Sequence, residues 1–104
     1  MKGGPFVKKL LSRVRFKRLA GDSAKSSGLK SGLVSLKPGE AVGSHCTGNK
    51  EEALIILEGR AKVFYGKKCA SAGKGCFVYI PRDIVHDVKN IGAGLLKYVY
   101  VTAS

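Results

Sequence analysis

The sequence lacks several features that would place it in other protein classes. No apolar run approaches the ~20 residues that a membrane-spanning helix needs. The three cysteines, Cys46, Cys69 and Cys76, are odd in number, show no C-x-x-C spacing and follow no apolar signal segment. We therefore expect a reduced, cytoplasmic protein without membrane contact. Cys69 and Cys76 are expected to be small buried side chains within strands.

Tryptophan is also absent and there are only 3 prolines, whereas 14 of the 104 residues are glycine. This balance predicts many turns and favours short strands over long helices. The chain contains no internal repeat of useful length and is long enough for one domain with one core. A single functional site is therefore expected.

Acidic residues are scarce, because 7 Asp and Glu stand against 19 Lys and Arg, for a formal net charge of +12. The excess is concentrated in residues 1–30, which hold nine basic residues and Asp22 as the one acid. We expect residues 1–28 to form a basic arm and loop within the same domain as residues 29–104. Residues 6–16 fit either a helical stripe or an extended arm leading into a strand, and residues 20–27 read as a loop.

A basic arm raises the alternative of nucleic-acid binding by residues 1–18, which would weaken steeply with salt. Phe16 is the one aromatic residue among the clustered basic residues, and no known binding motif is present. We therefore do not expect a nucleic-acid partner.

From Leu29 onward, short apolar runs are separated by turn signals, which is typical of an all-β sandwich or barrel. Strands are expected at residues 33–36, 41–45, 53–57, 61–65, 69–72, 76–80, 85–88 and 95–101. Each intervening segment contains Gly, Pro, Asn or Asp, which fix or tolerate turn conformations. No segment from 29 to 104 has enough length without such breakers to predict a helix.

The chain has only two histidines, His45 and His86. Side chains alternate along a strand, so Glu52 shares a face with the apolar residues two and four positions further on. If the strands on either side of residue 48 pair as a hairpin, the His45 imidazole and the Glu52 carboxylate converge, and His86 can join them from a separate strand. Two neutral imidazoles and one carboxylate suffice for Fe(II), Zn(II), Mn(II) or Ni(II) and leave positions for water or substrate.

Both histidines belong to a longer pattern in which the chain resembles a small single-domain cupin. The family's first motif, G(x)5HxH(x)3-4E(x)6G, is matched by Gly39, His45, Glu52 and Gly59. The second, G(x)5PxG(x)2H(x)3N, is matched by Gly75, Pro81, His86 and Asn90. The resemblance covers residues from about 29 to 101. It implies a jelly-roll β-barrel that binds one divalent transition metal through His45, Glu52 and His86.

Two positions depart from the cupin pattern. Asp83 replaces the glycine after the proline, a small change because Asp tolerates turn conformations. Thr47 replaces the second histidine of the first motif; a neutral hydroxyl is a poor metal ligand, although it can orient a bound water. The remaining triad is expected to bind metal less tightly than four ligands would, with open positions for small ligands and oxygen. Cys46 would become a ligand only if the strand register slipped by one residue.

The resemblance implies a metal-dependent enzyme of oxygenase, isomerase or decarboxylase type that takes a small polar or anionic molecule. The catalytic residues are not assigned. Tyr98 and Tyr100 alternate on one face of the last strand and are expected to line the pocket with Thr47, unless they are core aromatics. The alternative function is a non-catalytic binding module with a decayed metal site.

Other basic residues and the arm complete the expectations. Arg82, Lys62 and Lys97 could meet an anionic substrate, but each is more simply a solvated surface residue. Small cupins are commonly dimers, so the resemblance also implies a homodimer with the basic arm at its interface.

Overall fold

The computed structural model describes residues 4–21 and 28–104, and all the regular structure in them is β-strand. The nine strands are β1 (Phe16–Ala20), β2 (Lys30–Leu36), β3 (His45–Cys46), β4 (Glu51–Glu58), β5 (Arg60–Tyr65), β6 (Lys68–Gly73), β7 (Phe77–Ile80), β8 (Val85–Asn90) and β9 (Leu96–Ala103). The all-β prediction is confirmed. Most of the loop expected at residues 20–27 lies outside the described residues. No helix in the described part is suited to crossing a membrane.

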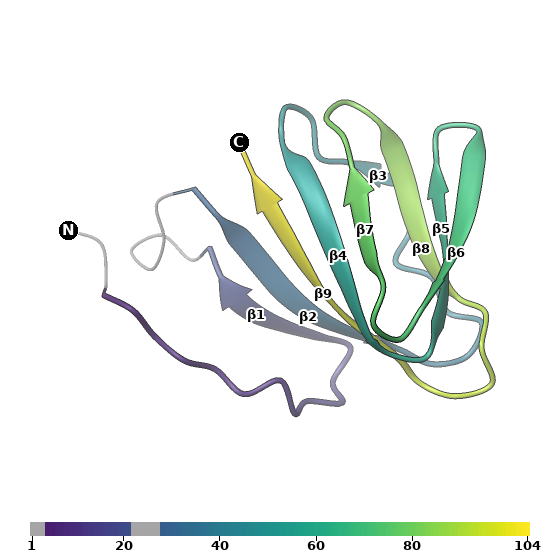
Figure 1. Cartoon of the computed structure of the whole chain (residues 1–104), viewed down its shortest axis with the longest axis horizontal. Helices are drawn as coiled ribbons and strands as arrows, with labels where there is room; N and C mark the ends of the chain where they lie inside the picture. The colour runs from purple at the N-terminus through teal and green to yellow at the C-terminus, as the bar shows by residue number, and fades with distance from the viewer. Residues whose placement is uncertain (1–3, 22–27) are drawn as a thin grey trace.

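The strands form two antiparallel sheets that pack against each other (Figure 1). One sheet has the order β1-β2-β9-β4-β7 and the other the order β3-β8-β5-β6. Strands β3 and β4 are neighbours in sequence but lie in different sheets, so residues 47–50 carry the chain from one sheet to the other. The hairpin expected between them is therefore wrong: β3 pairs with β8, and β4 pairs with β7 and β9.

The core between the sheets follows the alternation of the strands. In β4, Glu52, Leu54 and Ile56 are buried while their neighbours are less so, and in β8 the same holds for His86 and Val88. Each fully buried leucine or isoleucine contributes about 1.5–3 kcal/mol through the surface removed from water. Apolar side chains thus flank the two polar ones on both sheets, and their burial holds the polar pair in place.

Strand β1 makes part of the basic arm a member of the five-stranded sheet, as its edge next to β2. Residues 4–15 have no regular structure, so the helical alternative is wrong and the extended arm leading into a strand is right. Two lysines fasten this arm to β1. The Lys8 amino group donates to the Arg18 carbonyl and the Lys17 amino group donates to the Lys9 carbonyl, each at 3.2 Å.

The cysteines are free, as expected, but all three are exposed. Cys69 lies in β6, where four of the six residues are exposed because this strand forms a sheet edge. Cys76 precedes β7 instead of starting it. The prediction of buried strand positions is therefore wrong for both residues, since alternation alone does not reveal which strand lies at an edge.

Asn90 ends β8 and has a structural role. Its side-chain amide donates to the Leu36 carbonyl at 2.9 Å and to the Gly94 carbonyl at 2.8 Å, and its oxygen accepts from the Gly92 amide at 2.8 Å. The residue is buried, and these bonds supply the partners that a buried amide requires. Asn90 therefore ties β2 to the turn before β9.

Two glycines with the same backbone conformation provide a test of this packing. Gly59 and Gly75 both have φ of 86°. A Cβ at position 59 would collide with the Leu95 carbonyl oxygen and lie 2.9 Å from the Leu96 Cα, whereas nothing lies within 4 Å of one at position 75. The left-handed conformation costs alanine about 1–2 kcal/mol at either site, and only position 59 adds a backbone collision.

We expect Gly59→Ala to lower the free energy of unfolding by about 3 kcal/mol or more, and Gly75→Ala to lower it by only about 1–2 kcal/mol. Urea denaturation followed by circular dichroism measures both. Equal losses for the two variants would contradict the close approach of Gly59 to the chain before β9.

Candidate metal centre

The three residues expected to bind metal converge between the sheets. The potential ligand atoms of His45, Glu52 and His86 all lie within 4.8 Å of one another. His45 and His86 are direct partners in the β3–β8 pair, and their ring centroids are 4.3 Å apart. Glu52 reaches them from β4 in the other sheet, with its Oε1 2.9 Å from His86 Nε2.

Backbone carbonyls fix the orientation of both imidazole rings. His45 Nδ1 lies 2.9 Å from the Gly43 oxygen, and His86 Nδ1 lies 3.1 Å from the Ile84 oxygen. A carbonyl oxygen only accepts hydrogen bonds, so each Nδ1 carries a proton and donates it. The Nε2 atoms are therefore the ones that remain as ligands, which is the arrangement that metal-binding histidines use.

The contact between Glu52 and His86 is a buried ion pair when the imidazole is protonated. The two side chains are 7% and 1% exposed. The hydrogen bond to Glu52 raises the pKa of His86 above its ordinary value of 6.5, although burial of the ring opposes the shift. In that state Nε2–H donates to the carboxylate, so a proton stands where the His86 nitrogen would bind a metal. Metal and proton must therefore compete for this position.

Thr47, at the position of the missing motif histidine, closes the turn between the sheets. Its hydroxyl donates to the Lys50 carbonyl at 3.0 Å, and the Lys50 amide donates to the Thr47 carbonyl at 3.3 Å. The hydroxyl proton is therefore occupied by its hydrogen bond to the Lys50 carbonyl. Its oxygen can still accept a hydrogen bond from a water in the cavity.

Asp83, the second departure from the motif, adopts a conformation typical of glycine. It is the one non-glycine residue in the described part of the chain with positive φ, at 59°. Its amide donates to the Gly48 carbonyl at 2.8 Å. This bond joins the turn before β8 to the turn between β3 and β4, so the two loops that border the site are linked through their backbones.

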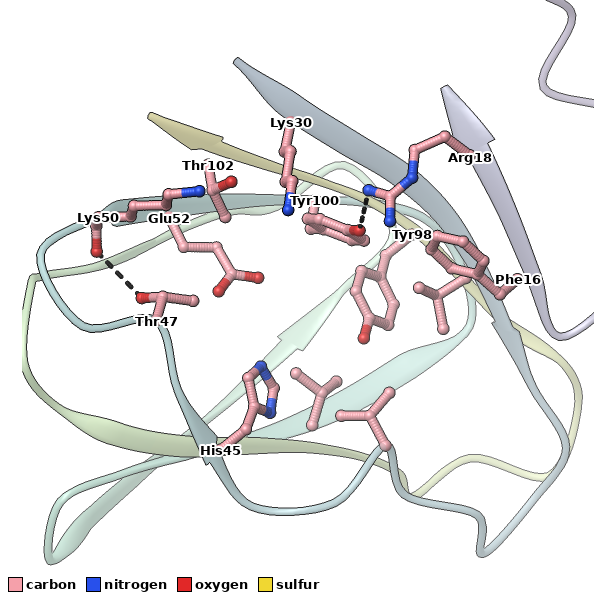
Figure 2. Close-up of a pocket in the computed structure, with 13 residues that line it drawn as sticks. Phe16, Arg18, Lys30, His45, Thr47, Lys50, Glu52, Tyr98, Tyr100 and Thr102 are labelled. Carbon is pink, nitrogen blue, oxygen red and sulfur yellow. Dashed lines mark hydrogen bonds between the residues drawn. The ribbon is translucent and has the colours of Figure 1, made fainter. Parts of the chain in front are cut away.

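A cavity of about 400 Å³ adjoins the three residues (Figure 2). Its wall includes His45 and Glu52 together with Thr47, Tyr98 and Tyr100, the residues that the sequence pointed to as pocket-lining. Tyr98 and Tyr100 lie on the inner face of β9 and project into this space. His86 is not part of the cavity wall and is 1% exposed.

Three cations in the cavity wall, Arg18, Lys30 and Lys50, were not expected from the sequence. Arg82, one of the cations considered, instead contacts the Asn49 carbonyl at 2.8 Å on the surface. The sequence did carry a signal, since Phe16 and Arg18 lie two positions apart and so share one face of a strand. It becomes informative only once β1 is known to pair with β2 and so to border the cavity.

Residues 32–102 match the sequence family described as Cupin domain. Because the match spans most of the chain, this protein belongs to the cupin family. No curated protein sequence matches it.

Solved structures share the fold. BH2720 of Bacillus halodurans superposes with a TM-score of 0.84 and 25% identity, covering 96% of this chain and 81% of that one. The cupin domain of Cnp3 from Schizosaccharomyces pombe gives 0.76 and 20%, covering 86% and 59%. Oxalate decarboxylase of Bacillus subtilis, with Mn(II) centres, gives 0.69 and 23%, covering 76% and 22%. This chain thus spans less than two thirds of the last two, and the cupin jelly roll is what they share.

The raised pKa of His86 makes the stability of the metal-free protein depend on pH. Because the folded-state pKa lies above the unfolded one, the ion pair contributes fully below about pH 6.5. The contribution is lost as the pH rises through the folded-state pKa. We expect the free energy of unfolding in the presence of a chelator to fall over that range in the wild type and to fall less in Glu52→Gln.

The same substitution should lower the pKa of His86, measured from its ring resonances by NMR. Glu51→Gln is the matched control, because Glu51 accepts from the Tyr79 hydroxyl and faces away from His86. A pKa of His86 that Glu52→Gln leaves unchanged would show that the carboxylate does not hold the proton.

Proposed function

We propose that this cupin binds one divalent transition metal, Fe, Zn, Mn or Ni, through His45, Glu52 and His86. We propose further that a small polar or anionic metabolite occupies the adjoining cavity. The observation that carries the proposal is the convergence of the three ligand atoms within 4.8 Å. The ligands come from three strands in two sheets, so the folded chain brings them together without a ligand.

The donor set suits such an ion. Imidazole nitrogen and carboxylate oxygen together bind Fe, Zn, Mn and Ni and leave positions open for water or substrate. The Gly43 and Ile84 carbonyls select the tautomers that direct Nε2 inward. A neighbour of the same fold, the Bacillus subtilis oxalate decarboxylase, has Mn(II) centres and acts on an anion, which supports the metal class and the anionic ligand.

A bound ion of this kind supplies Lewis acidity or activates oxygen. The chain's own residues provide the remaining chemistry of an active site. Glu52 neutralises positive charge at a buried position, and Val34, Val42 and Val88 keep water from part of the cavity wall. Oxygenase, isomerase and decarboxylase chemistry all remain open on this fold, because a fold does not select a reaction.

One observation favours a second candidate, a non-catalytic binding module. Glu52 and His86 satisfy each other at 2.9 Å without a metal, and the Thr47 hydroxyl is occupied by the Lys50 carbonyl. A chain that had lost its metal could therefore keep the same buried arrangement. The metal content of the purified protein separates the two candidates. The homodimer and the cytoplasmic location stay predictions from the sequence.

We expect untagged protein reconstituted with Fe(II), Zn(II), Mn(II) or Ni(II) to bind one ion per chain for at least one of these metals. His45→Ala and His86→Ala should each weaken that binding by about 100-fold or more, since losing a ligand should cost at least as much as losing one of its supporting partners. Elemental analysis and calorimetry measure the stoichiometry and the affinity.

Cys46→Ala is the matched control, because Cys46 follows His45 on β3 and would bind only if the register slipped. It should leave metal affinity unchanged. Less than one ion per chain for all four metals, or full binding by His86→Ala, would leave the non-catalytic module as the function.

The position of the missing ligand offers a gain-of-function test. We expect Thr47→His to raise metal affinity by about 10-fold or more, because it restores an imidazole at the motif position. Thr47→Val removes the hydrogen bond to the Lys50 carbonyl without adding a ligand, so it should not raise the affinity. Calorimetric titration of the three proteins with one metal compares them. Equal affinities for Thr47→His and Thr47→Val would show that position 47 does not face the metal.

A further inference from the structure

The cavity beside the metal site has a strongly cationic wall. Arg18, Lys30 and Lys50 line it, and among the described residues of its wall Glu52 is the one acid, which is already hydrogen-bonded to His86. The amino group of Lys30 makes no hydrogen bond or ion pair with any residue in the described part of the chain. A cavity with excess positive charge along its wall favours an anionic occupant.

Tyr98 presents an unpartnered donor to the same space. The residue is 3% exposed, yet its hydroxyl bonds to none of the residues at 4–21 and 28–104. Among those residues every fully enclosed side-chain nitrogen or oxygen has a partner, so this oxygen must open onto the cavity. Figure 2 shows the hydroxyl pointing from β9 toward the side of the cavity that holds His45.

The Tyr98 phenol is a hydrogen-bond donor at physiological pH. Burial of the ring, and to a lesser degree the charge of Glu52, raises the pKa of Tyr98 well above its usual range. Buried tyrosine hydroxyls normally find an acceptor. The acceptor here has to be supplied by whatever fills the cavity.

Tyr100, at the cationic end of the cavity, is likewise oriented to donate a hydrogen bond to the occupant. Arg18 Nη1 donates to the Tyr100 hydroxyl at 3.0 Å, so the phenol oxygen accepts and its own proton can be donated onward. The ring stacks on Phe16 at 6.3 Å between centroids. Gly32 makes this possible, because a Cβ there would lie 2.5 Å from Phe16 Cε1 and 2.6 Å from Tyr100 Cε2.

Apolar side chains complete the wall. Val34, Val42 and Val88 come from both sides of the cavity, and the Phe16 ring adds a further apolar surface. The occupant therefore needs an apolar body as well as oxygen atoms. A volume of about 400 Å³ lies within the range of roughly 300–1,000 Å³ found for small-molecule sites.

We propose that the cavity takes a small organic acid with an apolar body. Its carboxylate lies at the end formed by Lys30 and Tyr100, and a second oxygen accepts a hydrogen bond from Tyr98. Tyr98 and Lys30 are thereby the specificity-determining residues. This inference rests on the proposed function, because it names the class of molecule that the same cavity holds beside the metal.

The test compares matched probes: mandelate, 3-phenyllactate and 2-hydroxyisocaproate, each beside its neutral amide. Calorimetry is carried out on the full chain, once with a chelator and once loaded with Mn(II). We expect at least one acid to bind about 10-fold or more tightly than its amide in both forms, because charged hydrogen bonds contribute most to such differences.

The variants distinguish the role of Lys30, which binds the carboxylate, from that of Tyr98, which donates to the second oxygen. Lys30→Met should weaken acid binding about 10-fold and leave the amide unaffected. Tyr98→Phe should weaken acid and amide alike by about 3- to 10-fold, since both contain the hydroxyl oxygen. Lys89→Met, at an exposed lysine of β8 outside the cavity, is the control and should change neither. Circular dichroism verifies that all variants are folded.

The proposal fails if no acid outcompetes its amide, or if Lys30→Met binds the acid as tightly as the wild type does. Unchanged binding by Tyr98→Phe would also overturn it, because the hydroxyl would then contact water only. Acid preference in chelator together with no metal binding would refute the metal centre alone. Metal binding without acid preference would refute the organic-acid site alone.

Discussion

The buried contact between Glu52 and His86 is the constraint on which the rest of the structure depends. It joins one strand of each sheet, so β4 and β8 must both present their polar residue inward at the same level. A slip of one residue in either strand would turn that polar side chain outward and expose apolar ones. An unpaired carboxylate or imidazole in this core would cost about 1–3 kcal/mol or more. The alternation of both strands, the cavity and the metal site all follow from keeping this register.

The charge of the chain has two different uses. Lys8 and Lys17 fasten the extended arm to β1 through backbone carbonyls. Arg18 lies one residue further on but faces the cavity, where it orients Tyr100. The basic excess near the N-terminus is therefore not one surface. Because side chains alternate along β1, Lys17 points away from the cavity and holds the arm, whereas Arg18 points toward the cavity and lines its wall.

The sequence predicted the class of fold and the three converging residues well, because both rest on local patterns. Alternation placed Glu52 on the buried face of β4, and motif spacing selected His86. Pairing between distant strands could not be read in the same way: β3 crosses to the other sheet, although a hairpin with β4 was the simpler local solution. Arg18 could not be predicted for the same reason, since it borders the cavity only when β1 pairs with β2, and Lys30 does so only when β2 pairs with β9. The exposed Cys69 likewise depends on β6 being an edge strand, which no local pattern records.

The bond from the Asp83 amide to the Gly48 carbonyl has a consequence for the entropy of binding. It links the backbones of the two loops beside the site at 2.8 Å, so both loops hold their position before a ligand binds. Ordering a loop on binding consumes part of the interaction free energy, and a pre-organised site avoids that loss. The left-handed backbone conformation of Asp83, at φ 59°, costs a small part of the folding free energy. The two loops at the rim of the cavity are therefore already joined before a ligand arrives.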